Sequence, residues 1–377
     1  MIDFTLARMV KAPEYLWRAL RYYLAGKLFI PKPKKFYLRV TDRCNSACVM
    51  CSFWQKKPGR EPTVSEIQGI FANRLLNQLQ TVAIGGGEAI LRQDLSQIVQ
   101  VILAASAGVE KISILSNGLA PDLLEEQVTA IMALPEYRRL KRLEVILSLD
   151  GIGETHDKIR GVNNAYAKLL DSIAALKRIQ TRSPFDLKAT CTVQRSNLAD
   201  LPLVFKLGQE RGIHVSFRPV THKISAEDGL WQTQMLGAGE IRTLEKMFSE
   251  QIDLQMIDAV YWPDYFRVMR GERRQLPCAI PYASVLLTPE GDLYSCGRYD
   301  QVGQIIYGNV YEQEIDRIWY SKQAEKIRHD LRSSLCLRCE SPCEVALSLG
   351  EEVFYFARHL LRKQIRSFLP KSEKNLI

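Results

Sequence analysis

The sequence predicts an α/β fold built on a parallel sheet, and two patterns indicate it. Six short runs rich in β-branched and aromatic residues start 45, 30, 31, 43 and 29 residues apart, with helical patterns between them. This spacing is the rhythm of consecutive βαβ units. In addition, chemically suggestive stretches follow each of the first four runs, and the loops after the carboxyl ends of parallel strands carry the functional groups of such folds.

The expected strands, in order, are FYLRVT (from Phe36), TVAIG (Thr81), KISILS (Lys111), RLEVILSLD (Arg142), FDLKATCTV (Phe185) and HVSFRPV (His214). The helices expected between them include DLSQIVQVILAASA, DLLEEQVTAIMAL, AYAKLLDSIAALKRIQ and DLPLVFKLGQERG. Gly212 ends the last of these helices, since glycine accepts the left-handed backbone that commonly follows a helix. Past residue 236 the alternation of strands and helices fades.

Composition and length indicate a globular protein of one large and one smaller domain, because 377 residues with 46% hydrophobic side chains can bury a sizeable core. Arg18, Arg21 and Lys27 interrupt the apolar pattern of the first thirty residues, which argues against a signal peptide or membrane span. Nine cysteines, an odd number in tight clusters, fit metal-binding thiolates in a reducing cytoplasm better than a disulfide framework.

The positive charge of the chain lies at its two ends. The net charge is +9, of which residues 1 to 35 carry +6 and residues 353 to 377 carry +5, so that the middle carries −2. No basic segment shows the interleaved aromatic residues of a base-stacking surface. The charge pattern therefore disfavours a nucleic-acid partner.

Three cysteines follow the first expected strand within eight residues: Cys44, Cys48 and Cys51. Three thiolates on one short loop suit three corners of an iron-sulfur cube and leave the fourth iron open, as reactive metal centres do. The alternatives are a structural zinc site and a redox disulfide. Zinc would need a fourth ligand, and no histidine lies nearer in sequence than His156.

The CxxxCxxC spacing, joined by Gly-Gly-Glu after the second strand, resembles the radical S-adenosylmethionine (radical SAM) superfamily over residues 36 to about 343. The resemblance implies a partial (β/α)6 TIM-like barrel and assigns Cys44, Cys48 and Cys51 as catalytic ligands of a 4Fe-4S cluster. It also implies that SAM chelates the free iron. One electron, delivered by a reductant such as flavodoxin or ferredoxin, then cleaves SAM to a 5′-deoxyadenosyl radical.

The resemblance extends to the loop after the second strand. Gly86 and Gly87 would let the backbone approach the methionine end of SAM, and the Glu88 carboxylate would pair with its ammonium. Ala89 stands where the family usually has proline. Met50, where many members have an aromatic residue, is expected to pack on the adenine.

A third matching stretch, SLDGIGETHDKIRG, follows the fourth strand. It resembles a motif of the branch that carries auxiliary clusters, which implies that Ser148 contacts the ribose, that Arg160 contacts SAM and that Asp150 belongs to the same cofactor site. Structural interpretations stay open here: Asp150 could cap the turn before the fourth helix, and His156 with Asp157 could be a surface pair.

A second group of cysteines lies near the C-terminus: Cys278, Cys296, Cys336, Cys339 and Cys343. ASVLLTPEGDLYSC reads as a hairpin whose open end would bring the first two together, a layout that zinc ribbons and iron-sulfur centres share. The group resembles the SPASM/Twitch extension, a small α+β cysteine-rich, cluster-binding domain with seven cysteines and two clusters. Five cysteines imply one auxiliary 4Fe-4S cluster, held by the first four as an electron carrier, with Cys343 spare or displacing one of them. Cys191, alone in the fifth strand, is expected to be a core residue.

These motifs divide the chain into five expected parts: residues 1–35, a helical segment; 36–236, the barrel; 237–277, a connection; 278–343, the auxiliary cluster domain; and 344–377, a basic helix. Residues 4 to 30 and 345 to 369 both read as amphipathic helices. Such helices usually dock on their own protein. The sharper alternative is weak peripheral contact with an anionic membrane, at the inner face for a cytoplasmic protein.

The function expected from the resemblance is hydrogen-atom abstraction from a small-molecule or lipid-linked substrate, followed by oxidation, epimerisation or bond formation. The 35 residues before the first strand are too few for a leader-binding domain, which favours such substrates over a peptide. Peptide or protein maturation is the alternative. A non-catalytic metal-binding regulator would explain the cysteines and not the other motifs, and an RNA-modifying enzyme would be favoured by an RNA-binding module that the sequence does not show.

Overall fold

The computed structural model describes residues 29–55, 57, 59–221, 230–254, 258–274, 278–296 and 306–341, and all structural statements below concern these residues. By their contacts they fall into two compact units. The larger unit consists of Lys32–Leu254 and Ser284–Ile327, and the smaller one contains Phe29–Pro31 and the described residues of Gln255–Ala283 and from Arg328 onward.

Six parallel strands follow one another through the larger unit: β1 (Lys35–Thr41), β2 (Thr81–Gly86), β3 (Lys111–Ser116), β4 (Arg142–Ser148), β5 (Asp186–Val193) and β6 (His214–Pro219). Each strand pairs in parallel with the next one along the chain. All six predicted strands are therefore confirmed, with their ends within two residues of the predicted positions. The sheet does not close on itself among the described residues, because β6 lies at one edge.

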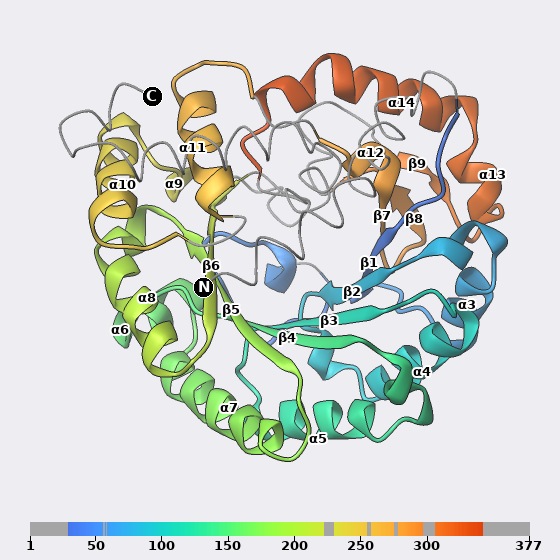
Figure 1. Ribbon diagram of the computed structural model, residues 1–377, viewed down its shortest axis with the longest axis horizontal. Helices are drawn as coiled ribbons and strands as arrows, with labels where there is room; N and C mark the ends of the chain where they lie inside the picture. Colours follow the sequence, from blue (N-terminus) through green and yellow to red (C-terminus); the bar gives the residue numbers. More distant parts are fainter. Residues whose placement is uncertain are drawn as a thin grey trace, which may run out of the picture. The chain divides into compact units, whose positions relative to one another are not determined.

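The helices of this unit are α3 (Val64–Phe71), α4 (Leu95–Ala105), α5 (Pro121–Met132), α6 (Glu154–Arg160), α7 (Ala165–Gln180), α8 (Leu201–Glu210), α9 (Leu230–Thr233) and α10 (Ala238–Glu250). Short 3-10 turns occupy Phe53–Gln55, Arg74–Gln78, Ala89–Leu91, Pro135–Arg139 and Arg195–Asp200. Figure 1 shows α3, α4, α5 and α7 along the outer side of the curved sheet. The four predicted helices are confirmed as α4, α5, α7 and α8.

Alternation along β5 and β6 gives this part of the sheet a buried face and a half-buried face. On β5 the side chains of Leu187, Ala189, Cys191 and Val193 are buried, whereas the residues between them are half-buried. Successive side chains of a strand point to opposite faces, so the buried set packs against the helix layer. Cys191 lies in this set and is fully buried, which confirms it as a core residue.

Three further strands extend the sheet beside β1: β7 (Ser284–Leu287), β8 (Asp292–Tyr294) and β9 (Ile306–Asn309). β7 pairs in parallel with β1, and β8 pairs with β7 in the predicted antiparallel hairpin. Gly291 turns the hairpin with a φ of 92°, a backbone conformation that glycine adopts readily. The strands are followed by α13 (Ile315–Trp319) and α14 (Lys322–Ser333), and α14 ends in the smaller unit. The hairpin thus continues the barrel sheet.

The smaller unit contains α11 (Asp258–Met269), α12 (Ile280–Ala283) and the 3-10 turn Leu335–Arg338. An aromatic cluster on α11 forms part of its core: Tyr261, Trp262, Tyr265 and Phe266. The two predicted terminal helices lie outside the described residues, except for Phe29 and Ile30. Within the described residues, no helix combines the length and the apolar character needed to cross a membrane.

Candidate active site

The loops after β1, β2, β3 and β4 meet at one rim of the larger unit. The amide of Asn117, after β3, lies 3.9 Å from the thiol of Cys44 and donates a 2.7 Å hydrogen bond to Asn45. Gly87, after β2, donates from its backbone to Thr41 at 2.8 Å. The structure therefore brings together the stretches that the sequence predicted to share a rim.

The cysteine loop is pinned to the end of α6. Ala47 N–H donates to the backbone oxygen of Arg160 at 2.9 Å, and Val49 N–H donates to that of Ile159 at 3.0 Å. Gly161, with a φ of 63°, closes the helix, and a Cβ atom at this position would collide with the carbonyl of Ala47. Glycine is thus required here by backbone conformation and by close approach.

The three thiols of the loop differ in their surroundings. Cys48 is buried, and Cys44 and Cys51 are half-buried. Burial, with smaller contributions from the negative charges of Cys48, Glu88 and Cys51, raises the pKa of the Cys44 thiol to about 12, although a hydrogen bond with the Ser46 backbone opposes this rise. A bound metal centre would favour the thiolate over the thiol, because coordination deprotonates thiols and the positive charge of the metal offsets the repulsion between thiolates. The donor set therefore fits a cationic centre.

A single metal ion would need ligands that converge on one point. Among the described residues, no three His, Cys, Asp or Glu side chains do so. An iron-sulfur cube makes no such demand, since each of its cysteines binds a different iron.

The glycines after β2 serve a close backbone approach. Cβ atoms at Gly86 and Gly87 would collide with the carbonyls of Thr41 and Arg43, respectively. Glu88 N–H donates to the Arg43 carbonyl at 2.8 Å. The segment that these glycines approach in the structure is the backbone leading into the cysteine loop. Their predicted approach to SAM stays a prediction.

Glu88 is a buried carboxyl that faces backbone amides. It accepts hydrogen bonds from Asn117 N–H at 2.6 Å and from Ile90 N–H at 3.3 Å. Burial raises the pKa of Glu88 to about 7, because these hydrogen bonds and the distant charge of Arg160 offset only part of the desolvation. An ammonium group bound beside Glu88 would supply the missing positive charge.

Arg160 and Asp150 form a buried ion pair next to Cys48. Arg160 Nη2 lies 2.5 Å from Asp150 Oδ2, and Nη1 lies 3.5 Å from Cys48 Sγ. Burial alone would lower the pKa of Arg160, but the charges of Asp150 and Cys48 outweigh burial and raise it. Within the described residues, Arg160 Nε has no hydrogen-bond partner.

The structure corrects two open interpretations of this stretch. His156 is fully buried, so it is not part of a surface pair. Its Nδ1 accepts from Asp150 N–H at 3.1 Å, and burial, with the charge of Arg160, lowers the pKa of His156 to about 3. Asp150 does not cap α6, whose N-cap is Gly153; its Oδ1 accepts from Thr192 N–H on β5 at 2.6 Å instead.

Two other predicted cofactor residues lie at the same end of the sheet. Ser148 ends β4 beside Thr190 of β5, so two hydroxyl-bearing residues stand in register. Met50 packs on Val220, the residue after β6, together with Met235. Their predicted contacts with the ribose and the adenine of SAM stay predictions.

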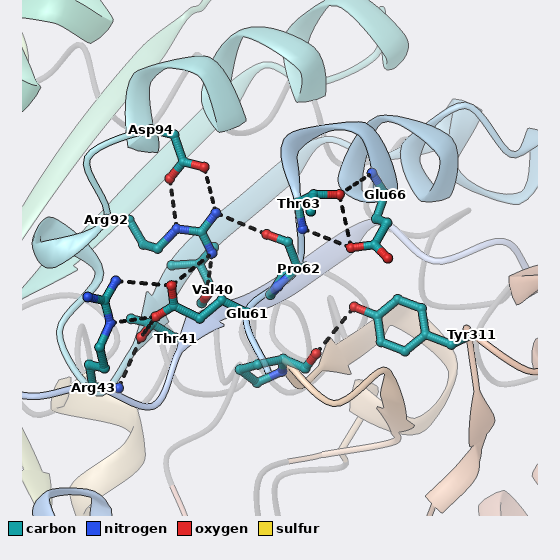
Figure 2. Close-up of polar contacts among 11 residues, drawn as sticks. Val40, Thr41, Arg43, Glu61, Pro62, Thr63, Glu66, Arg92, Asp94 and Tyr311 are labelled. Carbon is teal, nitrogen blue, oxygen red and sulfur yellow. Dashed lines mark hydrogen bonds and ion pairs between the residues drawn. The ribbon is translucent and has the colours of Figure 1, made fainter. Parts of the chain in front are cut away.

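A polar network that sequence reasoning missed supports the entry to the cysteine loop (Figure 2). Arg92 donates to the carbonyls of Val40 and Pro62, each at 2.9 Å, and forms an ion pair with Asp94 at 2.7 Å. Glu61 accepts from Arg43 at 2.7 and 3.0 Å and also from the Thr41 hydroxyl. Burial would raise the pKa of Glu61, but the hydrogen bonds from Arg43 and Thr41 outweigh it and lower the pKa.

The signal that could have found this network is weak. Arg92 and Asp94 stand two residues apart just after the glycine loop, a spacing that also occurs in ordinary helix starts. Apart from Asp94, the partners of the Arg43 and Arg92 guanidinium groups lie 18 to 52 positions away in the sequence. Only the fold brings them together.

The C-terminal cysteines are described in part. Within the smaller unit, a hydrogen bond with Cys336 lowers the pKa of Cys278, and the nearby charge of Arg274 acts in the same direction. Arg274 is buried and donates to the carbonyls of Cys339 at 3.4 Å and Ser341 at 3.2 Å. Cys296 belongs to the larger unit, and Cys343 lies outside the described residues. Arg274 thus lies beside Cys278 and Cys339 in the smaller unit, whereas the N-terminal triplet lies on a loop of the larger unit.

Comparison with known families gives two matches. Residues 38–195 match the model of the radical SAM superfamily, and residues 278–340 match SPASM, an iron-sulfur cluster-binding domain. The first match contains the cysteine triplet, the Gly86-Gly87-Glu88 loop and the stretch SLDGIGETHDKIRG. The second contains four of the five C-terminal cysteines.

The chain is also similar to proteins of known name. It is 24% identical over 317 residues to the AdoMet-dependent heme synthase of Methanosarcina barkeri (strain Fusaro / DSM 804), covering 76% of this chain and 82% of that protein. It is 21% identical over 339 residues to the sporulation killing factor maturation protein SkfB of Bacillus subtilis (strain 168), covering 88% and 75%. The crystal structure of Streptococcus suis SuiB bound to precursor peptide SuiA matches with a TM-score of 0.59 at 14% identity, over 92% of this chain and 78% of that one. The structural match supports the fold.

Proposed function

Because the chain belongs to the radical SAM superfamily, in the branch with a SPASM domain, we propose that Cys44, Cys48 and Cys51 hold the SAM-binding 4Fe-4S cluster of this enzyme. One observation carries the proposal: the three thiols, Glu88 and the Asp150–Arg160 pair lie on neighbouring loops at one rim. When bound, the cluster supplies the electron that cleaves SAM to a 5′-deoxyadenosyl radical, which takes a hydrogen atom from the substrate.

The side chains around the thiols have separate tasks in SAM binding. The Glu88 carboxyl, buried and without a cationic side chain in contact among the described residues, pairs with the SAM ammonium. Arg160 Nε–H, buried and without a partner among the described residues, is the donor left for the SAM carboxylate. Ser148 and Asp150 complete the site at the end of β4, with Ser148 facing the ribose. Met50 supplies an apolar contact for the adenine.

One auxiliary 4Fe-4S cluster, held by Cys278, Cys296, Cys336 and Cys339, completes the proposed cofactors. The SPASM match and the contact between the first and third of these thiols support it. Four cysteine ligands leave no open iron, so this cluster carries electrons to or from the substrate and does not bind the substrate. Flavodoxin or ferredoxin is the proposed reductant.

The proposed substrate is a small molecule or a lipid-linked metabolite, oxidised, epimerised or joined after hydrogen abstraction. Similarity to a heme synthase over 76% of the chain supports a non-peptide substrate. Peptide maturation is the second candidate, and similarity to the maturation protein SkfB over 88% of the chain favours it. Comparison of the metabolites of a strain lacking the gene with those of its parent separates the two: an accumulated small precursor supports the first, and an unmodified peptide supports the second.

Peripheral membrane contact through the basic termini is proposed as weak and reversible, at about 1 kcal/mol per basic residue near an anionic surface. The charge of +6 on residues 1 to 35 and +5 on residues 353 to 377 supports it. The protein should float with anionic liposomes at low salt and lose this behaviour without either tail. Failure of the full chain to float would remove the proposal.

Anaerobic reconstitution tests the central proposal. With iron, sulfide and a strong reductant, the protein should convert SAM to 5′-deoxyadenosine, measured by chromatography, and Cys48→Ala should abolish the product. Cys191→Ala is the matched control, because it removes a buried thiol that belongs to neither group. A wild-type protein that carries zinc at the N-terminal triplet, or iron whose spectrum ignores SAM, would support the non-catalytic regulator instead.

A further inference from the structure

The guanidinium of Arg160 contacts a proposed cluster ligand directly. Its Nη1 lies 3.5 Å from Cys48 Sγ, and its Nη2 lies 2.5 Å from Asp150 Oδ2. The side chains of Arg160 and Asp150 are 8% and 0% exposed, respectively. Water screens charges poorly in such a place, so each charge acts strongly on the neighbouring sulfur.

The pair has little freedom to move away from the sulfur. Asp150 Oδ1 accepts from Thr192 N–H on β5, and the Asp150 carbonyl accepts from the Asn197 amide at 2.7 Å. Asp150 N–H donates to Nδ1 of His156, a neutral side chain that adds no charge. Three segments thus fix Asp150, and Asp150 fixes Arg160.

The backbone of Arg160 is fixed as well. Its carbonyl accepts hydrogen bonds from Ala47 N–H and from the Ser46 hydroxyl, both at 2.9 Å. The same Ser46 hydroxyl lies 3.0 Å from Cys48 Sγ. The distance between the guanidinium and Cys48 is therefore set by the main chain on one side and by the Asp150 carboxylate on the other.

Reduction adds a negative charge to an iron-sulfur cluster. Hydrogen bonds to its sulfurs and nearby positive charges favour the reduced form and raise the potential, and nearby negative charges lower it. Arg160 therefore raises the potential, and Asp150 cancels part of this effect. The net shift in the reduction potential therefore depends on both charges of the pair, although only the Arg160 guanidinium contacts the ligand sulfur.

We propose that the Asp150–Arg160 pair sets the reduction potential of the SAM-binding cluster through Cys48. The inference rests on the proposed role of Cys48 as a ligand and goes beyond the SAM contact of Arg160, because it acts before SAM binds. Asp150 and His156 are positioning residues in this scheme. A low potential makes the cluster a strong reductant, which cleavage of SAM requires.

The test is a redox titration of the reconstituted protein, monitored by electron paramagnetic resonance without SAM. The signal to follow is the one whose shape changes when SAM is added to a parallel sample, which separates it from the auxiliary cluster. Arg160→Gln should lower the midpoint potential, and Asp150→Asn should raise it. Each shift should be about 59 mV, which is a tenfold change in the equilibrium constant of a one-electron couple.

The opposite signs distinguish electrostatic tuning from a structural role, because a loosened site that admits water would move both variants in one direction. The double variant should return close to the wild-type potential. Asp157→Asn is the matched control. Asp157 lies on α6 and, within the described part of the chain, accepts only from the backbone N–H groups of Asn164 and Tyr166, so the midpoint potential of the cluster in this variant should stay unchanged.

Shifts of the same sign, or unchanged potentials in both variants, would overturn the inference. If Arg160→Gln does not load a cluster, Asp150→Asn decides alone, and an unchanged or lower potential overturns it. A wild-type protein with no SAM-sensitive signal would instead refute the proposed function.

Discussion

Two glutamates flank the cysteine loop, and their surroundings are opposite. Glu61 accepts hydrogen bonds from Arg43 and Thr41, and Arg92 lies 3.9 Å away. Within the described residues, Glu88 accepts hydrogen bonds from backbone amides and the Ser116 hydroxyl, and the charge of Arg160 lowers the pKa of Glu88 less than these hydrogen bonds do. The first carboxylate is already neutralised by the protein. The second has an unmet demand for positive charge, and this difference separates a supporting network from a binding group.

The largest effect is expected where the Glu61 network is broken at its centre. Arg92→Gln removes a guanidinium that holds the carbonyls of Val40 and Pro62 and the carboxylate of Asp94. Its loss leaves buried acceptors unpaired and should lower the free energy of unfolding by about 3 kcal/mol, measured by urea denaturation of the apoprotein.

Arg92→Lys serves as the control for charge. An ammonium group cannot reach both carbonyls and the carboxylate as the planar fork does, so this variant should recover only part of the loss. Full recovery would show that the charge of Arg92, and not its geometry, supports the loop.

The second effect concerns the pH dependence that Glu88 imposes on the apoprotein. Its pKa of about 7 lies above that of an unfolded glutamate, so the folded state binds the proton more tightly, and stability falls as the pH rises between the two values. At 1.36 kcal/mol per pKa unit, the free energy of unfolding of Glu88→Gln, relative to that of the wild type, should rise by about 3 kcal/mol between pH 4 and pH 8. The measurement is urea denaturation of both apoproteins across this pH range. A difference in the free energy of unfolding that stays constant with pH would show that burial does not raise the pKa of Glu88.

The loops and strands were predictable from the sequence because their signals are local. β-Branched runs, helical periods and glycine turns each act within a few residues, and they located β1 to β6 and the rim. The cysteine spacing is local as well, which explains why Cys44, Cys48 and Cys51 could be proposed as cluster ligands without a structure.

The contacts that decide the electrostatics of the site were not predictable. His156 and Asp157 are adjacent polar residues on one helix, yet only His156 is fully buried, because its ring lies against the Asp150 backbone and Tyr166. The pairing of β7 with β1 joins residues about 250 positions apart, which no local pattern encodes. Arg160 next to Cys48 is a contact across 112 positions.

The third effect is on SAM binding. Glu88→Gln keeps the size of the side chain but cannot form a charged pair with an ammonium, and hydrogen bonds to charged groups contribute about 1.5–3 kcal/mol. The dissociation constant for SAM should rise about tenfold to a hundredfold, measured by calorimetry on the reconstituted enzyme before reduction. Glu125→Gln, which removes a surface carboxylate paired with Arg178, is the control. Equal affinity of Glu88→Gln and the wild type for SAM would show that the SAM ammonium does not bind beside Glu88.

The smallest effect should come from Glu61→Gln, and its pH dependence should have the opposite sign to that of Glu88. The carboxylate is about a quarter exposed, at 27%, so solvent screens its pairs, and the loss at pH 7 should be about 1 kcal/mol. Because the pKa of Glu61 is lowered on folding, its stabilisation is present above the pKa of an unfolded glutamate and is lost as the pH falls through the folded value. Urea denaturation of the apoprotein at pH 7 and at the lowest pH where it stays folded should therefore show the gap between wild type and Glu61→Gln closing in acid. If the difference in the free energy of unfolding instead became smaller toward alkaline pH, the Glu61 carboxylate would lack a neutralising cation, as Glu88 does. The contrast between the two glutamates would then not hold.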